Sequence, residues 1–433
     1  MKMKRIKPGI KAESFDILQY FYRSAHEPII HAVIRFGAEL DDQIFMQALN
    51  CSLEDTPQMR SGFSEGFFRA RWIMQNIEAQ DILTLVCEEN DAQEQINRLL
   101  CTPIDFENGP QIKLFLIRSS DRKDSLCVIC SHLVCDGAGL KEWLSLLAGH
   151  YSELRGMQRS SYSKPNVQRG LKQITDRLTS SERRAVMRSK SPQLRQGEMT
   201  LPHFSASRTN PLILTETIGR EEVQAIHRCA KQHGATLNDV LLCAYARLLS
   251  ELTGSAHISF PCPVDLRKHL RKGEAHGICN LTSNYYLSLN MEDTKPFAEV
   301  LAEVMKQMNR QKARKDELKP LMQFDRLCRA VPFFLLKRIV PKFFSVPRIS
   351  YTNLGIIEKD KICFGKIVPI SVFMTGAVKR AQNFQISVSS FDGAMTLSSN
   401  RYAAESDEQF LRNALHVMRK DLIDSCNVSN HIV

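Results

Sequence analysis

The stretch that decides the fold runs Ser125-Leu-Cys-Val-Ile-Cys-Ser131 and continues as His132-Leu-Val-Cys-Asp-Gly137. Its first part is apolar and rich in strand-forming residues. It predicts a short strand in which every second residue from Leu126 to His132 lies on one face. The glycine at the end of the second part suits the turn that follows a strand. The stretch therefore places a candidate proton acceptor at the end of a strand.

A helix is expected directly after this strand. In residues 137–151, apolar side chains recur at spacings of three and four, which is typical of one buried helical stripe. The members of the stripe are Leu140, Trp143, Leu144 and Leu147. His132 is therefore expected in a loop between a strand and a helix, where a side chain is held firmly and faces a cleft.

A histidine in such a loop is suited to general-base chemistry. Its ordinary pKa lies near neutrality, so a neutral imidazole accepts the proton of an alcohol or amine as that group attacks a carbonyl carbon. Asp136 is expected to point away from this proton and to shape the loop, because a buried carboxylate needs an arginine as its partner. The alternative interpretation of the same residues is a core histidine followed by a turn aspartate.

Further motifs follow along the chain in a characteristic order. They are Pro103-Ile-Asp105 with Gly109-Pro110, Gly234-Ala-Thr-Leu-Asn-Asp-Val240, Pro263-Val-Asp-Leu-Arg267, Asn280-Leu-Thr-Ser-Asn284, Thr352-Asn-Leu-Gly355 and Phe391-Asp-Gly393. With these motifs the sequence resembles the chloramphenicol acetyltransferase-like superfamily. The resemblance is to the branch that holds non-ribosomal peptide condensation domains, alcohol O-acetyltransferases and polyketide-associated acyltransferases. It spans most of the chain and rests on the order of the motifs.

The resemblance implies a role for each motif residue. His132 would be the catalytic base, or the group that positions the acceptor, and Asp136 would form a structural ion pair with Arg267. Gly137 and Arg267 would support the site, and the ion pair would tie the loop of His132 to the second half of the molecule. The alternative for Arg267 is a position in a solvated basic loop.

Two further positions refine this expectation. Peptide-bond-forming condensation domains usually present two adjacent histidines, whereas Ser131 precedes His132 here, as in many ester-forming and amide-forming acyltransferases. This difference favours acyl transfer other than peptide elongation. Asn353 matches a position near the active-site cleft in the alcohol-acyltransferase branch, so the resemblance implies that it binds substrate, and its amide would hold the loop or donate to a developing oxyanion. The alternative is a turn asparagine ahead of Gly355.

The fold that the resemblance implies is α/β, with two chloramphenicol acetyltransferase-like subdomains that form a pseudo-dimer around a tunnel at their junction. Strand and helix patterns alternate in both halves, which agrees with this class. We expect the N-terminal subdomain at residues 1–160, a polar, basic linker with one helix at 161–210, and the C-terminal subdomain at 211–433. His132 would lie midway along the tunnel, with the thioester arriving from one face and the acceptor from the other.

Local signals predict three elements of the second half. Thr236 with Asp239 is a capping pair at a helix N-terminus, and Asp392-Gly393 between two alternating runs predicts a hairpin. The last helix is expected to begin at Ser406, with Gln409 as its capping partner. Its buried stripe would consist of Leu411, Ala414, Leu415, Met418 and Leu422.

The function that follows is an acyltransferase that moves an acyl group from a thioester to a hydroxyl or amine acceptor. Acyl-CoA is the expected donor and a co-substrate, an acyl carrier protein is the alternative donor, and no permanently bound cofactor is expected. One rival is a stand-alone condensation domain that uses carrier-bound substrates. A rival of another class is a non-catalytic relative that serves as a binding or scaffolding module.

Composition limits the partners. The chain of 433 residues is 43% hydrophobic, and no membrane span is expected. The basic residues 1–7 lack the apolar core of a signal peptide, so the expected location is the cytoplasm. The formal net charge is +11, and basic residues gather in 267–272 and 310–315. No aromatic residues are interleaved with them there, which argues against nucleic acid as a binding partner. The charge suits the phosphates of coenzyme A or an acidic carrier protein, although a solvated helix face is the alternative for 310–315.

Two motifs suggest other chemistry. The 13 cysteines stand mostly alone in apolar runs and are expected to be reduced. Cys127 and Cys130 would point to opposite faces of a strand, so no metal site is expected. Gly62-Phe-Ser-Glu-Gly66 has the form of a serine-hydrolase elbow, but its flanks lack the strand before it and the helix after it that the elbow requires. It is interpreted as a hairpin turn.

Overall fold

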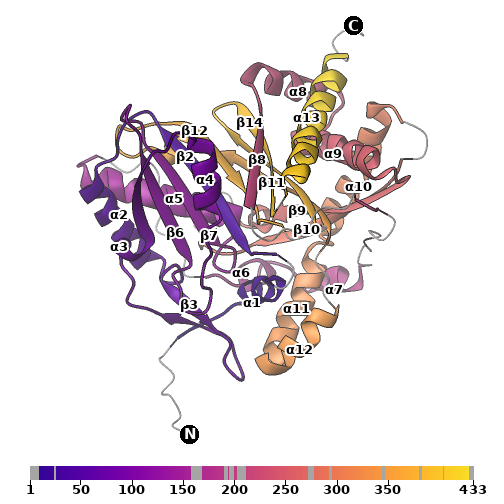
Figure 1. The fold of residues 1–433 in the computed structure, drawn as a ribbon. Coiled ribbons are helices and arrows are strands. Elements are labelled where there is room, and N and C mark those ends of the chain that lie inside the picture. Colours follow the sequence, from indigo (N-terminus) through magenta and orange to yellow (C-terminus); the bar gives the residue numbers. More distant parts are fainter. Residues whose placement is uncertain are drawn as a thin grey trace.

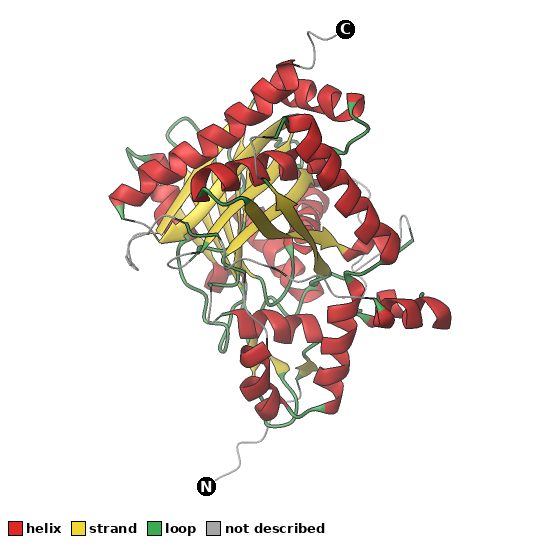
Figure 2. Cartoon of the chain, turned by 90° about the vertical axis from the view of Figure 1, so that its right-hand side faces the viewer, coloured by secondary structure: helices red, strands yellow, loops and turns green. Residues whose placement is uncertain are grey.

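Two α/β halves follow one another along the chain and lie side by side (Figure 1). The computed structural model describes residues 9–23, 26–157, 168–189, 194, 199–201, 211–271, 277–291, 295–343, 347–379, 383–402 and 404–428. In Figure 2 the helices surround the sheets. The architecture is the pseudo-dimer that the resemblance implied.

The described residues of the first half form twelve elements up to the helix after His132. They are β1 (Ile10–Lys11), α1 (Ser14–Tyr22), β2 (Ile29–Phe36), α2 (Asp42–Asp55), β3 (Ser61–Ser64), β4 (Arg71–Met74), α3 (Ala79–Ile82), β5 (Leu83–Cys87), α4 (Ala92–Leu100), β6 (Ile112–Arg118), β7 (Ser125–Ser131) and α5 (Gly137–Leu154). The predicted strand and helix around His132 are confirmed as β7 and α5.

The described parts of the predicted linker contain α6 (Lys172–Thr175) and α7 (Ser180–Arg188), so they hold a single-turn helix besides the one helix that was expected. Residues 158–167 lie outside the described residues, as do 190–193, 195–198 and 202–210.

The second half is richer in helices. Its elements are β8 (Pro211–Ile218), α8 (Arg220–Gln232), α9 (Leu237–Thr253), β9 (His257–Asp265), η1 (Leu266–His269), β10 (Thr282–Asn290), α10 (Phe297–Arg314), α11 (Leu318–Ala330), α12 (Phe333–Phe343), β11 (Ile349–Ile357), η2 (Lys359–Ile362), β12 (Pro369–Thr375), β13 (Phe384–Phe391), β14 (Ala394–Tyr402) and α13 (Glu405–Val428).

One strand of the second half completes the sheet of the first. The five-stranded sheet has the order β12-β2-β7-β6-β5, and β12 pairs with β2 in antiparallel register from Pro369↔Phe36 to Thr375↔His31. The sheet of the second half has the order β11-β13-β14-β8. Figure 1 shows β12 beside β2, within the first half. The predicted boundaries of the two subdomains stay a prediction, but backbone hydrogen bonds join the halves directly.

The strand before His132 is buried on both faces, which explains its continuous apolar run. Leu126, Val128 and Cys130 belong to a core cluster that includes residues of α2 and α5. Cys127 and Ile129 belong to a second cluster, which also contains Ile213 of β8. The predicted alternation is confirmed, and the thiols of Cys127 and Cys130 lie on opposite faces of the strand.

The local signals are confirmed except at the last helix. Thr236 caps α9 and forms a capping box with Asp239, and Asp392-Gly393 forms the turn between β13 and β14 with φ of +47° and +82°. The predicted start of the last helix is wrong, because α13 begins at Glu405. The backbone N–H of Ala404 donates to Asp407, so Asp407 has the capping role assigned to Gln409. The predicted stripe of α13 is buried.

Three further predictions meet the structure here. Gly62 to Ser64 lie in β3, which pairs with β4 as a hairpin, so no helix follows Ser64 and the hydrolase elbow is excluded. All thirteen cysteines are free thiols, as expected. Among the described helices, none combines the length and the apolar character needed to cross a bilayer.

Candidate active site

Backbone hydrogen bonds hold the first residues of the loop from Ser131 to Gly137. The N–H of His132 donates to the carbonyl of Pro28 at 2.7 Å, and the N–H of Val134 donates to the carbonyl of Ser131 at 3.1 Å. The hydroxyl of Ser131 is buried and accepts from the N–H of Leu133 at 3.2 Å. Ser131 therefore stabilises the turn, while His132 is left partly exposed at the junction of the two halves.

The imidazole of His132 is oriented by Asn280, which precedes β10 in the second half. The amide nitrogen of Asn280 donates to the carbonyls of His132 at 2.8 Å and Leu133 at 3.2 Å. Its oxygen therefore faces Nδ1 of His132, at 2.9 Å, and can only accept. This network assigns the proton to Nδ1 and leaves Nε2 with a free lone pair.

The surroundings of His132 keep the ring neutral. Burial lowers the pKa of His132 below its ordinary value of 6.5, and this effect outweighs the opposing charge of Asp136 and the hydrogen bond to Asn280. The positive charge of Lys379 lowers the pKa further. A neutral ring with a free Nε2 is the form that accepts a proton.

Asp136 holds the loop through its side-chain hydrogen bonds, and its expected orientation relative to the transferred proton stays a prediction. It is the N-cap of α5, and it accepts hydrogen bonds from four donors. These are the N–H of Gly139 at 2.8 Å, Nη1 of Arg267 at 3.0 Å, the N–H of Leu281 at 2.7 Å and Oγ1 of Thr282 at 2.8 Å. Burial alone would raise its pKa, but the charge of Arg267 and these hydrogen bonds lower it to about 2.

Arg267 is enclosed and is not part of a solvated loop, so the alternative interpretation of this residue is wrong. Its side chain is 8% exposed, and besides Asp136 it binds Asp265 at 3.1 Å and the carbonyl of Cys279 at 2.8 Å. The structure thus brings together the two residues that were expected to pair across the halves. Their functional roles stay predictions.

Gly137 permits close contact with the second half. A Cβ atom at this position would lie 2.4 Å from Cδ2 of Leu354 in β11. Asn353 is the neighbour of Leu354, and both ends of its side-chain amide bind nearby groups. Nδ2 donates to Asn238 at 3.0 Å, and Oδ1 accepts from the N–H of Gly355 at 2.8 Å. These contacts hold a bulge in β11. The assignment of Asn353 as a substrate-binding residue stays a prediction.

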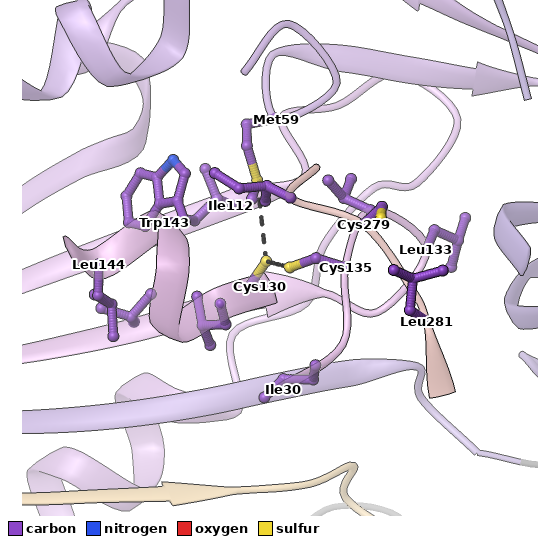
Figure 3. Close-up of a cluster of buried hydrophobic side chains, with 14 of the residues drawn as sticks. Ile30, Met59, Ile112, Cys130, Leu133, Cys135, Trp143, Leu144, Cys279 and Leu281 are labelled. Carbon is purple, nitrogen blue, oxygen red and sulfur yellow. Dashed lines mark hydrogen bonds between the residues drawn. The ribbon is translucent and has the colours of Figure 1, made fainter. Parts of the chain in front are cut away.

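The sulfur atoms of Met59, Cys130 and Cys135 lie close to one another in the core, as Figure 3 shows. The thiol of Cys130 lies 3.7 Å from the thiol of Cys135 and 4.0 Å from the sulfur of Met59. Cys135 is fully buried, and its hydrogen bond with Cys130, together with burial, raises the pKa of its thiol far above the ordinary value. Both cysteines are buried in the core, and the raised pKa keeps the thiol of Cys135 protonated and therefore a poor nucleophile.

Sequence reasoning missed three residues that position the loop. Asn280 and Thr282 lay in a quoted motif but received no role, and Arg169 lay in the predicted linker. Arg169 is buried, and its guanidinium donates to the carbonyl of Val134 at 2.8 Å and to Asp16 at 3.0 Å. The signal for Asn280 was its motif; Arg169 had no local signal.

Two cavities reach residues that contact this loop. One, of about 420 Å³, is lined by Glu27, Pro28 and Ile29 together with Phe106. The other, of about 790 Å³, is lined by residues that include Arg169 and Ile278. Pro28 binds the backbone of His132, and Arg169 binds that of Val134. Each cavity therefore adjoins a residue that holds the loop through its backbone.

Known proteins similar to this chain are large synthases. One of the plipastatin synthase proteins of Bacillus subtilis (strain 168) is 25% identical over 233 residues, which are 51% of this chain and 9% of that protein. Tyrocidine synthase 3 from Brevibacillus parabrevis is 22% identical over 424 residues, which are 93% of this chain and 6% of that protein. The chain therefore spans less than a tenth of the length of these relatives.

Solved structures agree on the fold. The first condensation domain of the calcium-dependent antibiotic synthetase matches with a TM-score of 0.69 at 15% identity, covering 97% of this chain and 98% of that one. Polyketide synthase associated protein 5 from Mycobacterium tuberculosis matches with a TM-score of 0.68 at 12% identity, covering 97% and 99%. The family model described as "Condensation domain" matches residues 17–329, which is more than half of the sequence. The chain therefore belongs to the condensation-domain family.

Proposed function

We propose that this protein transfers an acyl group from a pantetheine thioester to a hydroxyl or amine, with His132 as general base. The observation that carries the proposal is the hydrogen-bond network that leaves Nε2 of His132 neutral and unprotonated, because Asn280 accepts from Nδ1. The ring is held by an element of the opposite half, at the junction where family members of this fold combine two substrates.

The chemistry needs no covalent acyl-enzyme. Nε2 accepts the proton of the acceptor as its oxygen or nitrogen attacks the thioester carbonyl. The tetrahedral adduct then collapses, the C–S bond breaks, and the sulfur takes the proton from the imidazolium as free thiol. A positioned general base is expected to contribute about 10²- to 10⁴-fold to the rate.

A carrier protein is the donor that we now favour over free acyl-CoA. Membership of the condensation-domain family supports a carrier-bound thioester, which was the second choice from the motifs alone. The formal charge of +11 suits an acidic carrier surface. The exposed cations of α10, among them Arg310, Lys312 and Arg314, are better explained as a solvated helix face.

Thiol release is the test that separates the rival functions. The full chain is incubated with acetyl, hexanoyl and octanoyl thioesters, each on coenzyme A and on an acyl carrier protein, together with mixed amines and alcohols. We expect release that depends on an acceptor, is faster from the carrier, and falls about 10²-fold or more in His132→Ala. His227→Ala, an exposed histidine of α8, is the matched control.

Each outcome decides between the candidate functions. Release that is unchanged in His132→Ala would remove the histidine from the mechanism. Faster release from the coenzyme A esters would reverse the preference for the carrier. No release from any donor would favour the non-catalytic binding module.

A further inference from the structure

Lys379 is a buried cation at the junction of the two halves. It lies after β12, where its backbone N–H donates to the carbonyl of Asn400 and its carbonyl accepts from the N–H of Tyr402, both at 3.0 Å. It also forms an antiparallel bridge with His26, in the segment before β2. Segments from both halves therefore fix its backbone.

The ammonium group of Lys379 has donors to spare for a ligand. The residue is 7% exposed, and across the described part of the chain no carboxylate pairs with it and no hydrogen bond forms from its side chain. Burial lowers its pKa to about 8, so the group still carries its charge at neutral pH. Burying an unpaired charge is costly, and such groups are retained where a ligand compensates for them.

Lys379 lies close to the proposed base. Its charge contributes to the lowered pKa of His132. Its bridge partner His26 is two residues from Pro28, whose carbonyl binds the backbone N–H of His132. Pro28 also lines the cavity of about 420 Å³. The lining of this cavity does not include Lys379, so the bridge to His26 and the effect of the Lys379 charge on His132 are the observations that bring an anion bound at Lys379 near the imidazole.

A second buried cation, Arg401, lies on the backbone segment next to Lys379. Arg401 in β14 is 1% exposed and forms a parallel bridge with Lys379. Burial lowers its pKa to about 10, while the charge of Asp407 opposes this shift. Because the charge of the buried Asp407 also acts on Arg401, Lys379 is the cation on which an anionic ligand at this place would depend.

We propose that the ammonium of Lys379 binds a carboxylate of the acyl acceptor, so that the acceptor is a free amino acid or hydroxy acid. This inference rests on the proposed acyl transfer. A carboxylate a few bonds from the attacking atom would lie near both Lys379 and His132. The phosphates of a pantetheine donor are at the far end of a long arm from the thioester, so they suit this position less.

The acceptor's carboxylate accepts charge-assisted hydrogen bonds from the ammonium, and its amine or hydroxyl is then directed to Nε2 of His132. An acceptor bound to a carrier protein would have this carboxyl group tied up in its thioester. The proposal thus distinguishes a free acidic acceptor from a carrier-bound one.

The test measures binding without turnover. Glycine, alanine, phenylalanine, 3-hydroxybutyrate and the amide of each are titrated into the full chain by ligand-observed NMR. At least one acid should bind about 10- to 100-fold more tightly than its amide, the range of one hydrogen-bonded charge. Lys379→Met should abolish this preference for the acid without weakening the binding of the amide. Lys420→Met, an exposed lysine of α13, should preserve it.

Thermal stability shows whether the Lys379 variants are still folded and can test binding. Since the ammonium has no acceptor to lose among the described residues, Lys379→Met and Lys379→Gln should melt no lower than the parent protein. A large loss in both would mean that the lysine is structural and would overturn the proposal. So would the absence of a carboxylate preference in every pair.

Activity separates this proposal from the one on which it rests. If Lys379→Met lowers kcat equally for an acid and its amide without changing either affinity, the lysine stabilises the oxyanion and the carboxylate site is refuted. A carboxylate preference in a protein that releases no thiol would refute acyl transfer and leave the site standing.

Discussion

Replacing Asp136 with alanine should destabilise the chain by about 3 to 5 kcal/mol, because the charge of Arg267 would stay buried without its partner. The side chains of Asp136 and Arg267 are 4% and 8% exposed, so water cannot replace the lost contact without rearrangement. The substitution also removes the N-cap of α5, which is worth about 1 kcal/mol of that total.

The lowered pKa of Asp136 gives a second estimate of how much its ionised form stabilises the folded chain. A value of about 2, against 3.8 for the free carboxyl, corresponds to roughly 2 kcal/mol of stability at neutral pH. Because the pKa in the folded state is lowered, this contribution is present above pH 3.8 and is lost as the pH falls toward about 2. Asp136→Ala should cost more stability than protonation of Asp136 does. Protonation leaves a carboxyl group that still accepts hydrogen bonds, whereas alanine leaves Arg267 and the other donors without an acceptor.

The assay is urea unfolding of the parent, Asp136→Ala, Arg267→Met and the double variant. Trp72 and Trp143 both lie in the first half, so their fluorescence reports on that half, while far-ultraviolet circular dichroism reports on the whole chain. Coincident transitions would justify a two-state treatment. Glu408→Ala, which breaks an exposed i,i+4 pair with Arg412, is the control and should change stability by less than about 0.5 kcal/mol.

The double variant decides the reasoning. It should be clearly more stable than the sum of the single losses predicts, with a coupling energy of about 0.5 to 3 kcal/mol, since it no longer buries a lone charge. Additive losses would refute the ion pair as the source of the cost. So would an Asp136→Ala protein within about 1 kcal/mol of the parent.

Three further outcomes are expected. Gly137→Ala should cost no more than about 1 kcal/mol in urea, because its Cβ would meet only the end of the half-buried Leu354 side chain, which can rotate away; a larger loss would mean that this side chain is held in place. The pH profile of kcat/KM should fall on the acid side with an apparent pKa below 6.5, since burial lowers that of His132; an inflection above 6.5 would contradict this. Asn280→Leu should lower kcat more than it raises KM, and equal effects on both would argue against a positioning role.

The strand, the loop and the helix around His132 could be predicted because their signals are local. Alternation and a three-and-four spacing lie within one continuous stretch, and the structure has them as β7 and α5. The pairing of Asp136 with Arg267, by contrast, joins residues 131 positions apart and was expected only from the resemblance. Periodicity does not report contacts over such separations.

The features that escaped prediction all depend on contacts that the folded chain creates. The residues of β12 form a strand that hydrogen-bonds to β2, but no local pattern shows which sheet a strand will join. Asn280 contacts His132 across 148 positions, and Lys379 is a lysine in a loop until the fold encloses it. At the last helix, the predicted capping pair was Ser406 with Gln409, but the helix begins at Glu405 and the backbone N–H of Ala404 donates to the carboxylate of Asp407.

The contacts between the halves explain why the site should act only in the assembled chain. The neutral tautomer of His132 depends on Asn280, and the loop that carries it depends on Arg267, both from the second half. Lys141 of α5 adds bonds to the carbonyls of Leu354 and Ile356 in β11. A first half expressed alone would also lack β12 at the edge of its sheet. It should therefore leave β2 unpaired on one side and His132 without a fixed tautomer, and the two halves are best regarded as one structural unit.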